Sequence, residues 1–178
     1  TGSKQSVVNW PCLTVEKKTG ILKSDRLKAN IVNLPGIYSL STISLEEEIA
    51  SNYVMDRKMD LIINIVDATS LERNLFLTYQ LLDSDIPMII ALNGMDIIKR
   101  NQERIDHETL SKQLDVPVIP ISASKKTGMD DLIHAIETYD INEKRKQHRY
   151  NDDIEEKLNH INEYMNDRFL SVRFFEDG

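Results

Sequence analysis

Short apolar runs alternate with segments of helical spacing through the middle of the chain. The runs at residues 61–66, 87–92 and 116–121 each have the length of one buried strand. The segments that favour helix lie at residues 71–82, 96–101, 107–114 and 128–139. Strands that alternate with helices of this size need crossover connections, so neighbouring strands run parallel. The sequence therefore predicts an α/β fold with a doubly wound, mostly parallel sheet.

The residues before this alternation show other patterns. Residues 14–23 and 27–34 carry alternating and β-branched positions with a turn between them, which predicts a hairpin. The order Ser-Leu-Glu-Glu at residues 44–47 is a capping box, which predicts a helix that continues to about Arg57. Residues 1–8 are polar and show no clear periodicity.

The C-terminal part has a charged stretch followed by a helical pattern. Residues 141–150 are highly charged and are typical of a linker. Four apolar residues then recur at spacings of four, three and four, as one stripe on a helix: Ile154, Leu158, Ile161 and Met165. We therefore expect two domains, an α/β domain at residues 1–140 and a linker with a partial helical domain at residues 141–178.

Composition limits the possible partners. A net charge of −7 over 178 residues argues against a nucleic-acid surface, which is usually basic. It does not exclude a nucleotide, because backbone amides and a metal ion can hold phosphates. The single cysteine, Cys12, allows no internal disulfide and favours a reducing compartment. No apolar run approaches the ~20 residues of a membrane-spanning helix, and no signal peptide is visible.

The most informative polar residues follow the run at 87–92. Asn93 and Asp96 stand at the end of this expected strand, and ligands of open α/β sheets bind at the carboxyl ends of strands. A carboxylate there can accept two hydrogen bonds from the ring N–H and the exocyclic amine of guanine, which adenine does not offer. The Asn93 side chain can hold neighbouring loops and meet the base. The alternative is that Asp96 only caps a helix N-terminus.

A second polar loop closes the next expected strand. Ser122, Ala123 and Ser124 are small, so their backbone N–H groups can approach a base carbonyl. Taken alone, this loop is more typical of a helix N-cap and a turn than of a base-binding site. Two such loops on consecutive strand ends favour one shared base-binding site, formed by Asn93, Asp96, Ser122 and Ala123.

Two further positions suit a phosphate and a metal ion. Residues 33–36 read Asn-Leu-Pro-Gly and resemble the D-x-x-G loop of GTPases. Gly36 would let its backbone N–H reach a γ-phosphate without a side chain in the way. The hydroxyl of Thr14, upstream in a polar stretch, could coordinate magnesium. The alternatives are an ordinary β-turn glycine and an ordinary strand threonine.

The order of these motifs is that of a translation-factor-type GTPase. Three longer stretches resemble the cytosolic domain of the bacterial ferrous iron transport protein B (FeoB) family: residues 9–18 (NWPCLTVEKK), 34–40 (LPGIYSL) and 65–75 (IVDATSLERNL). The similarity extends from residue 1 to about residue 139. The C-terminal tail is similar, less specifically, to the helical domain that follows the GTPase unit in that family.

This resemblance implies a P-loop GTPase fold with a C-terminal helical appendage. It implies binding of GTP and GDP with magnesium, a candidate role for potassium, and slow GTP hydrolysis with the loops around Thr14 and Gly36 as switches. It also implies a role in ferrous iron uptake through a membrane permease domain of the same polypeptide, at the cytoplasmic face of the bacterial cell membrane. A homo-oligomer is a further candidate partner. Because Ile37 rather than Gln follows Gly36, no catalytic side chain is identified.

Two alternatives stay open beside this function. One is a degenerate GDP- or GTP-binding regulatory module with little or no hydrolysis. The other is a soluble GTPase that is not linked to transport.

The chain departs from the family pattern at three places. The phosphate loop G-x-x-x-x-G-K-[S/T] is absent, and Thr1-Gly2 matches the end of the helix that follows it. We therefore expect a trimmed chain, and an intact mass near 20.5 kDa would contradict this. Asn33 replaces the family's Asp, so its hold on magnesium through a water should weaken. Gly94 replaces a bulky residue, so a side chain along the base is lost.

Overall fold

A computed structural model describes residues 6–9, 16–24, 26–41, 43–142 and 146–177. By its internal contacts the chain divides into two compact units, Thr1–Asp56 and Arg57–Gly178. Thr14 and Cys12 lie outside the described residues. The expected division into residues 1–140 and 141–178 stays a prediction.

The first unit contains a small antiparallel sheet. Its strands are β1 (Ser6–Asn9), β2 (Glu16–Lys23) and β3 (Lys28–Asn33), in the order β1-β2-β3. The antiparallel pairing of β2 with β3 confirms the predicted hairpin. Strand β1 was not predicted, because its sequence Ser-Val-Val-Asn does not alternate between polar and apolar residues.

Helix α1 (Leu45–Met55) begins with the predicted capping box. The Ser44 hydroxyl accepts a hydrogen bond from the Glu47 N–H, and the Glu47 carboxylate accepts one from the Ser44 N–H. Each of these bonds is 3.2 Å long. The same carboxylate accepts bonds from the hydroxyls of Ser41 and Ser39, which hold the pKa of Glu47 below its usual range. These bonds tie the segment that follows Gly36 to the start of the helix.

The second unit contains the parallel sheet that the alternation predicts. Its strands are β4 (Ile62–Asp67), β5 (Met88–Asn93) and β6 (Val118–Pro120), in the order β4-β5-β6. Both strand pairs are parallel, with Asp67 opposite Asn93 at the end of the first pair. The predicted α/β class is therefore confirmed.

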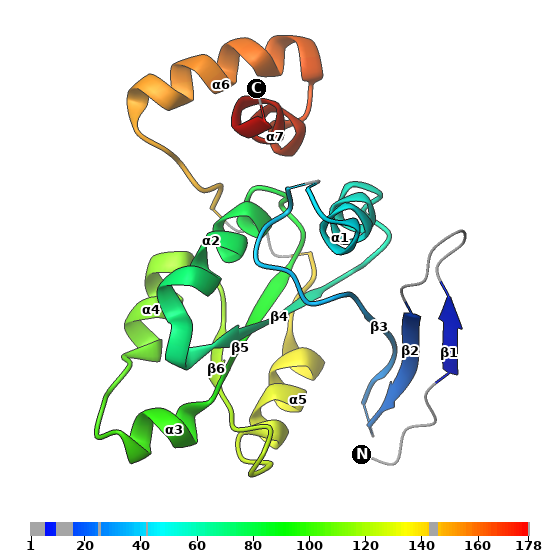
Figure 1. Cartoon of the computed structure of the whole chain (residues 1–178), viewed down its shortest axis with the longest axis vertical. Coiled ribbons are helices and arrows are strands. Elements are labelled where there is room, and N and C mark those ends of the chain that lie inside the picture. Colours follow the sequence, from blue (N-terminus) through cyan, green and yellow to red (C-terminus); the bar gives the residue numbers. More distant parts are fainter. Residues whose placement is uncertain (1–5, 10–15, 25, 42, 143–145, 178) are drawn as a thin grey trace. The chain divides into compact units, whose positions relative to one another are not determined.

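Helices flank both faces of this sheet. They are η1 (Ala68–Ser70), α2 (Leu71–Leu82), α3 (Met95–Arg100), α4 (His107–Leu114) and α5 (Met129–Thr138). Alternate residues of β5 point to opposite faces. Ile89 and Ala91 pack with Leu132 of α5, while Figure 1 shows α2 and α4 on the other side of the sheet. Because β5 is covered on both sides, its residues from Met88 to Leu92 are buried.

The tail forms two helices, α6 (Asp152–Met165) and α7 (Arg168–Asp177), where one was predicted. The chain turns at Asn166, which has φ of 50° and caps the end of α6. The predicted stripe is buried at Leu158, whereas Met165 is exposed. Among the described residues, no helix combines the length and the apolar character needed to cross a membrane.

A polar cluster joins the linker to α2 and to the tail helices, and we call it the polar clasp. The Tyr150 hydroxyl donates to the Asp83 carboxylate over 2.6 Å. The Arg168 guanidinium forms two bonds with the Glu155 carboxylate, 3.0 and 2.7 Å long, and one with the His148 carbonyl oxygen. Because Glu155 and Asp83 are buried, these bonds offset the cost of removing their charges from water.

The clasp predicts a pH effect at Asp83. Its side chain is buried at the end of α2, and among the described atoms one of its oxygens has no hydrogen-bond partner. Burial raises the pKa of Asp83, and the charge of Glu176 raises it further. The Tyr150 hydrogen bond and the charges of His148 and Arg168 lower this pKa but are outweighed by burial. The folded protein therefore holds this proton more tightly than the unfolded chain does, and the stability contribution falls as pH rises through the raised pKa.

Asp83→Asn should remove this pH dependence. The free energy of unfolding of the variant, minus that of the wild type, is expected to increase as pH rises from about 4 through the raised pKa of Asp83. Urea unfolding at a series of pH values measures this difference, in which the other titrating groups cancel. A difference that stays constant with pH would contradict the prediction.

Candidate functional site

The carboxyl ends of the three parallel strands bring polar residues together. Asp67 ends β4 and lies opposite Asn93, which ends β5. The ladder continues beyond β6, where the Ile121 N–H donates to the Leu92 carbonyl over 2.8 Å, so Ser122 follows at the same edge. The candidate site is therefore at the sheet edge where the sequence placed it.

Asp96 faces the loop after β6 and does not cap its own helix. Its Oδ1 accepts a 2.8 Å hydrogen bond from the Ser122 hydroxyl, and its Oδ2 lies 3.6 Å from the Lys125 Nζ. The residue at the N-cap of α3 is Gly94, and no side chain caps this helix, so the capping alternative for Asp96 is wrong. The Ser122 hydrogen bond, with help from Lys125, holds the pKa of Asp96 below its usual range. The carboxylate is thus ionised and accepts hydrogen bonds at neutral pH.

Asn93 joins the two loops. Its Oδ1 accepts a 3.0 Å hydrogen bond from the Ala123 N–H. This contact fulfils the expected holding role of Asn93, since it fixes the position of the second loop against the end of β5. In this structure the Ala123 N–H is therefore used within the protein, and its expected approach to a base carbonyl stays a prediction.

The loop from Ser122 to Thr127 is a closed turn. Its two end residues exchange backbone hydrogen bonds of 3.0 and 3.1 Å, and Gly128 then forms the N-cap of α5 with φ of 72°. The turn interpretation of this loop is thus confirmed, and the N-cap interpretation is wrong. A Cβ atom on Gly128 would collide with the Pro120 carbonyl oxygen, so glycine lets α5 start directly against the end of β6.

Asp67 and Thr69 lie beside Gly94 at the same sheet edge and were not predicted as candidate site residues. The Asp67 carboxylate accepts bonds from the Thr69 N–H (2.9 Å) and hydroxyl (2.8 Å). Gly94 has φ of 90°, and a Cβ atom there would lie 3.5 Å from the Asp67 Oδ1. The sequence signal that could have identified Asp67 is its position: it directly follows the expected strand at residues 61–66, as Asn93 follows the next strand, and the two residues are opposite each other in the parallel register.

Gly94→Ala is expected to cost about 1 kcal/mol of stability, because an alanine must adopt the left-handed backbone conformation there while its Cβ meets only ordinary contacts. Urea unfolding of the 178-residue chain measures this cost. Gly20→Ala is the matched control, since no atom of the described residues lies within 4 Å of its Cβ position and its φ is not positive. Equal stability of wild type and Gly94→Ala would contradict the prediction.

The phosphate and metal candidates belong to the other compact unit. Asn33 ends β3 with its side chain exposed, and Gly36 is also exposed. A Cβ atom on Gly36 would meet nothing within 4 Å, and its φ is not in the left-handed region. Neither packing nor backbone conformation among the described residues therefore requires glycine at this position. Thr14 lies outside the described residues.

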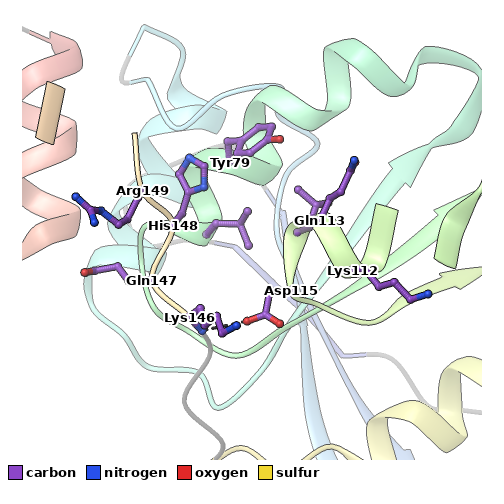
Figure 2. A pocket seen from close by; sticks show the side chains of 10 residues that line it. Tyr79, Lys112, Gln113, Asp115, Lys146, Gln147, His148 and Arg149 are labelled. Atoms are coloured by element: carbon purple, nitrogen blue, oxygen red, sulfur yellow. Dashed lines mark hydrogen bonds between the residues drawn. The ribbon is translucent and has the colours of Figure 1, made fainter. Parts of the chain in front are cut away.

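A cavity of about 280 Å³ lies elsewhere in the second unit. Tyr79 and Leu82 at the end of α2, residues 112–115 at the end of α4 and linker residues 146–149 line it (Figure 2). Two of these lining residues are bonded to each other, since the Asp115 carboxylate accepts a 3.0 Å bond from the Lys146 N–H. Crossover helices run opposite to the strands, so helix C-termini lie away from the strands' carboxyl ends. This cavity is therefore separate from the candidate site.

Sequence comparison finds relatives along most of the chain. The family model described as Ferrous iron transport protein B matches residues 1–136. The Fe(2+) transporter FeoB of Escherichia coli (strain K12) is 46% identical over 147 residues, which cover 80% of this chain and 19% of that protein. The chain thus spans about one fifth of the length of the curated relatives it matches.

Structure comparison agrees with these matches. A mutant of S. thermophilus NFeoB bound to GDP matches with a TM-score of 0.90 and 38% identity, over 99% of this chain and 72% of that one. The cytosolic domain of T. maritima FeoB in its GMPPNP form matches with a TM-score of 0.88 and 30% identity, over 98% and 72% of the two chains. These matches confirm the P-loop GTPase type of fold. The chain belongs to the Ferrous iron transport protein B family.

Proposed function

We propose that this chain is the guanine-nucleotide-binding domain of a ferrous iron transporter and that it reads the base with Asp96. The observation that supports this most is the pair of contacts that joins the two loops: Asp96 with Ser122 and Asn93 with the Ala123 N–H. These contacts pre-organise an ionised carboxylate at the strand edge. The GDP that is bound in the related S. thermophilus protein supports the same ligand class.

The carboxylate accounts for the choice of guanine. Guanine presents two adjacent donors, its ring N–H and its exocyclic amine, which a carboxylate accepts side by side. Adenine presents an acceptor at the corresponding ring nitrogen, so it would leave an ionised oxygen without a partner. Leaving such a group unpaired costs about 1–3 kcal/mol or more, which is sufficient for strong discrimination.

By the family resemblance, the phosphates and magnesium would be held by Thr14, Asn33 and Gly36. The Gly36 N–H would meet the γ-phosphate, which agrees with a glycine that no packing among the described residues demands. The Thr14 hydroxyl and the Asn33 amide oxygen would serve magnesium, the latter through a water. The metal would neutralise phosphate charge, and these side chains supply the oxygen ligands that magnesium prefers. Potassium is a further candidate ion.

In this proposal GTP binding and slow hydrolysis regulate or drive ferrous iron uptake through the permease domain of the same polypeptide. The domain would lie at the cytoplasmic face of the bacterial membrane. Contact between copies of the protein is a candidate mechanism for regulating its activity. Asn33 supports a second candidate, a regulatory module that binds GDP and GTP with little hydrolysis. Family membership argues against a GTPase that is not linked to transport.

Calorimetric titration of the full-length natural polypeptide with GDP and with ADP tests the base preference, and a GTP turnover assay separates the two candidates. We expect GDP to bind at least 100-fold more tightly than ADP. Similar affinities for the two nucleotides would refute the proposal. Tight GDP binding without turnover would select the regulatory module.

Asn33→Asp should strengthen magnesium-dependent GTP binding by about tenfold, because a charged acceptor holds a magnesium-bound water more strongly than an amide does. Titration of the full-length polypeptide with a non-hydrolysable GTP analogue, with and without magnesium, measures the change. GDP binding without magnesium is the control and should not change. Equal magnesium-dependent affinities for the two forms would contradict the assigned role of Asn33.

A further inference from the structure

Lys125 places a cation beside the carboxylate that we assign to guanine. Its Nζ lies 3.6 Å from the Asp96 Oδ2, while the Ser122 hydroxyl donates to the Asp96 Oδ1 over 2.8 Å. Both oxygens of this carboxylate are therefore engaged within the protein.

The loop holds the backbone of Lys125 but leaves its side chain exposed. The Lys125 N–H lies 3.4 Å from the Ser122 hydroxyl oxygen, inside the turn that Ser122 and Thr127 close. The Lys125 side chain is 65% exposed, whereas that of Asp96 is only 19% exposed. The ammonium thus reaches Asp96 from the solvent side, on a flexible four-carbon stem.

A guanine base needs the same oxygen. Its two parallel donors would use one lone pair on each carboxylate oxygen, and the ammonium, which lies 3.6 Å from Oδ2, competes with them for the negative charge of that oxygen. We propose that Lys125 is an internal competitor of guanine: it pairs with Asp96 when no base is bound and must move away when a base arrives. This inference rests on the proposed base-reading role of Asp96.

The expected effect is a moderate change in affinity. Exposed ion pairs of this kind alter equilibria by about 1.5- to fivefold. Lys125 therefore tunes how tightly the base is held and how readily it leaves, while Asp96 decides which base is chosen. Because salt screens exposed pairs, the competition should weaken as ionic strength rises.

The test compares Lys125→Met with Lys126→Met in the full-length natural polypeptide, using a fluorescent GDP analogue as the probe. Lys126 is the next residue in the same turn and is also exposed, so both variants lose one charge from the same loop. Lys125→Met should bind the probe about 1.5- to fivefold more tightly at low salt, and this gain should shrink at high salt. Lys126→Met should bind as the wild type does. Unchanged or weaker binding by Lys125→Met, or an equal gain in both variants, would overturn the proposal.

Combining Lys125→Met with Asp96→Asn distinguishes a failure of this inference from a failure of the proposed function. In Asp96→Asn the residue that pairs with Lys125 is neutral, so Lys125→Met should have no effect on the binding of xanthosine diphosphate, the nucleotide whose base suits an Asn. If GDP binding is insensitive to the loss of the Asp96 carboxylate, the proposed function fails. If it depends on that carboxylate and Lys125→Met still has no effect, only the competitor role of Lys125 fails.

Discussion

Asp96→Ala is expected to weaken GDP binding by roughly 100- to 10,000-fold while ADP binding changes little. The variant loses the acceptor of two hydrogen bonds that involve a charged group, each worth about 1.5–3 kcal/mol. It also removes the partner of the Ser122 hydroxyl and of the Lys125 ammonium, so of the three contacts described above only the Ala123 N–H bond to Asn93 still holds the loop after β6. Calorimetric titration of the full-length polypeptide measures both affinities.

Asp130→Ala is the control for this variant. Asp130 lies in the first turn of α5, just after the same loop, and is exposed. Its replacement removes one negative charge from the neighbourhood of the site and should leave GDP affinity unchanged. A loss of less than tenfold in Asp96→Ala, or an equal loss in Asp130→Ala, would contradict a specific base-reading carboxylate.

Gly128→Ala is expected to destabilise the chain by about 2–5 kcal/mol. The new Cβ would collide with the Pro120 carbonyl oxygen and would press on Ile121, so the backbone must shift. The alanine would also have to adopt φ of 72°. Overpacking commonly costs about 1–3 kcal/mol, and the left-handed conformation about 1–2 kcal/mol. Urea unfolding of the 178-residue chain measures the loss.

The other glycines provide a graded comparison for this substitution. Gly94→Ala has a positive φ but only ordinary contacts, and Gly20→Ala has neither a positive φ nor a close neighbour. The cost should therefore rise in the order Gly20, Gly94, Gly128. A Gly128→Ala variant as stable as Gly20→Ala would show that α5 can begin farther from the end of β6 without penalty.

Much of the fold was predictable because the second unit has strong patterns. The ends of α2 and α4 agree with the predicted residues 71–82 and 107–114, where turn residues bound each helical segment. The break between α6 and α7 was not predictable, because it depends on the left-handed conformation of Asn166, and such a conformation leaves no periodic signal. The four-residue strand β1 was missed for a similar reason.

The site was predictable in position but not in detail. Asn93 and Asp96 could be placed together with Ser122 and Ala123, because parallel strands deliver their carboxyl ends to one edge. The direction of the Lys125 side chain and the use of the Ala123 N–H by Asn93 depend on the closed turn after β6, which a single sequence does not specify. The role of Thr14 stays a prediction.

The base-reading role of Asp96 is tested most directly by the nucleotide preference of Asp96→Asn. Xanthine carries a carbonyl oxygen where guanine carries its exocyclic amine, so an Asn amide can donate to it, whereas the wild-type carboxylate cannot. The ratio of the affinities for GDP and xanthosine diphosphate should be measured by competition in the full-length polypeptide. We expect the ratio to invert, from a strong preference for GDP in the wild type to a preference for xanthosine diphosphate in the variant. An unchanged preference for GDP would contradict the assignment of Asp96 as the residue that selects guanine.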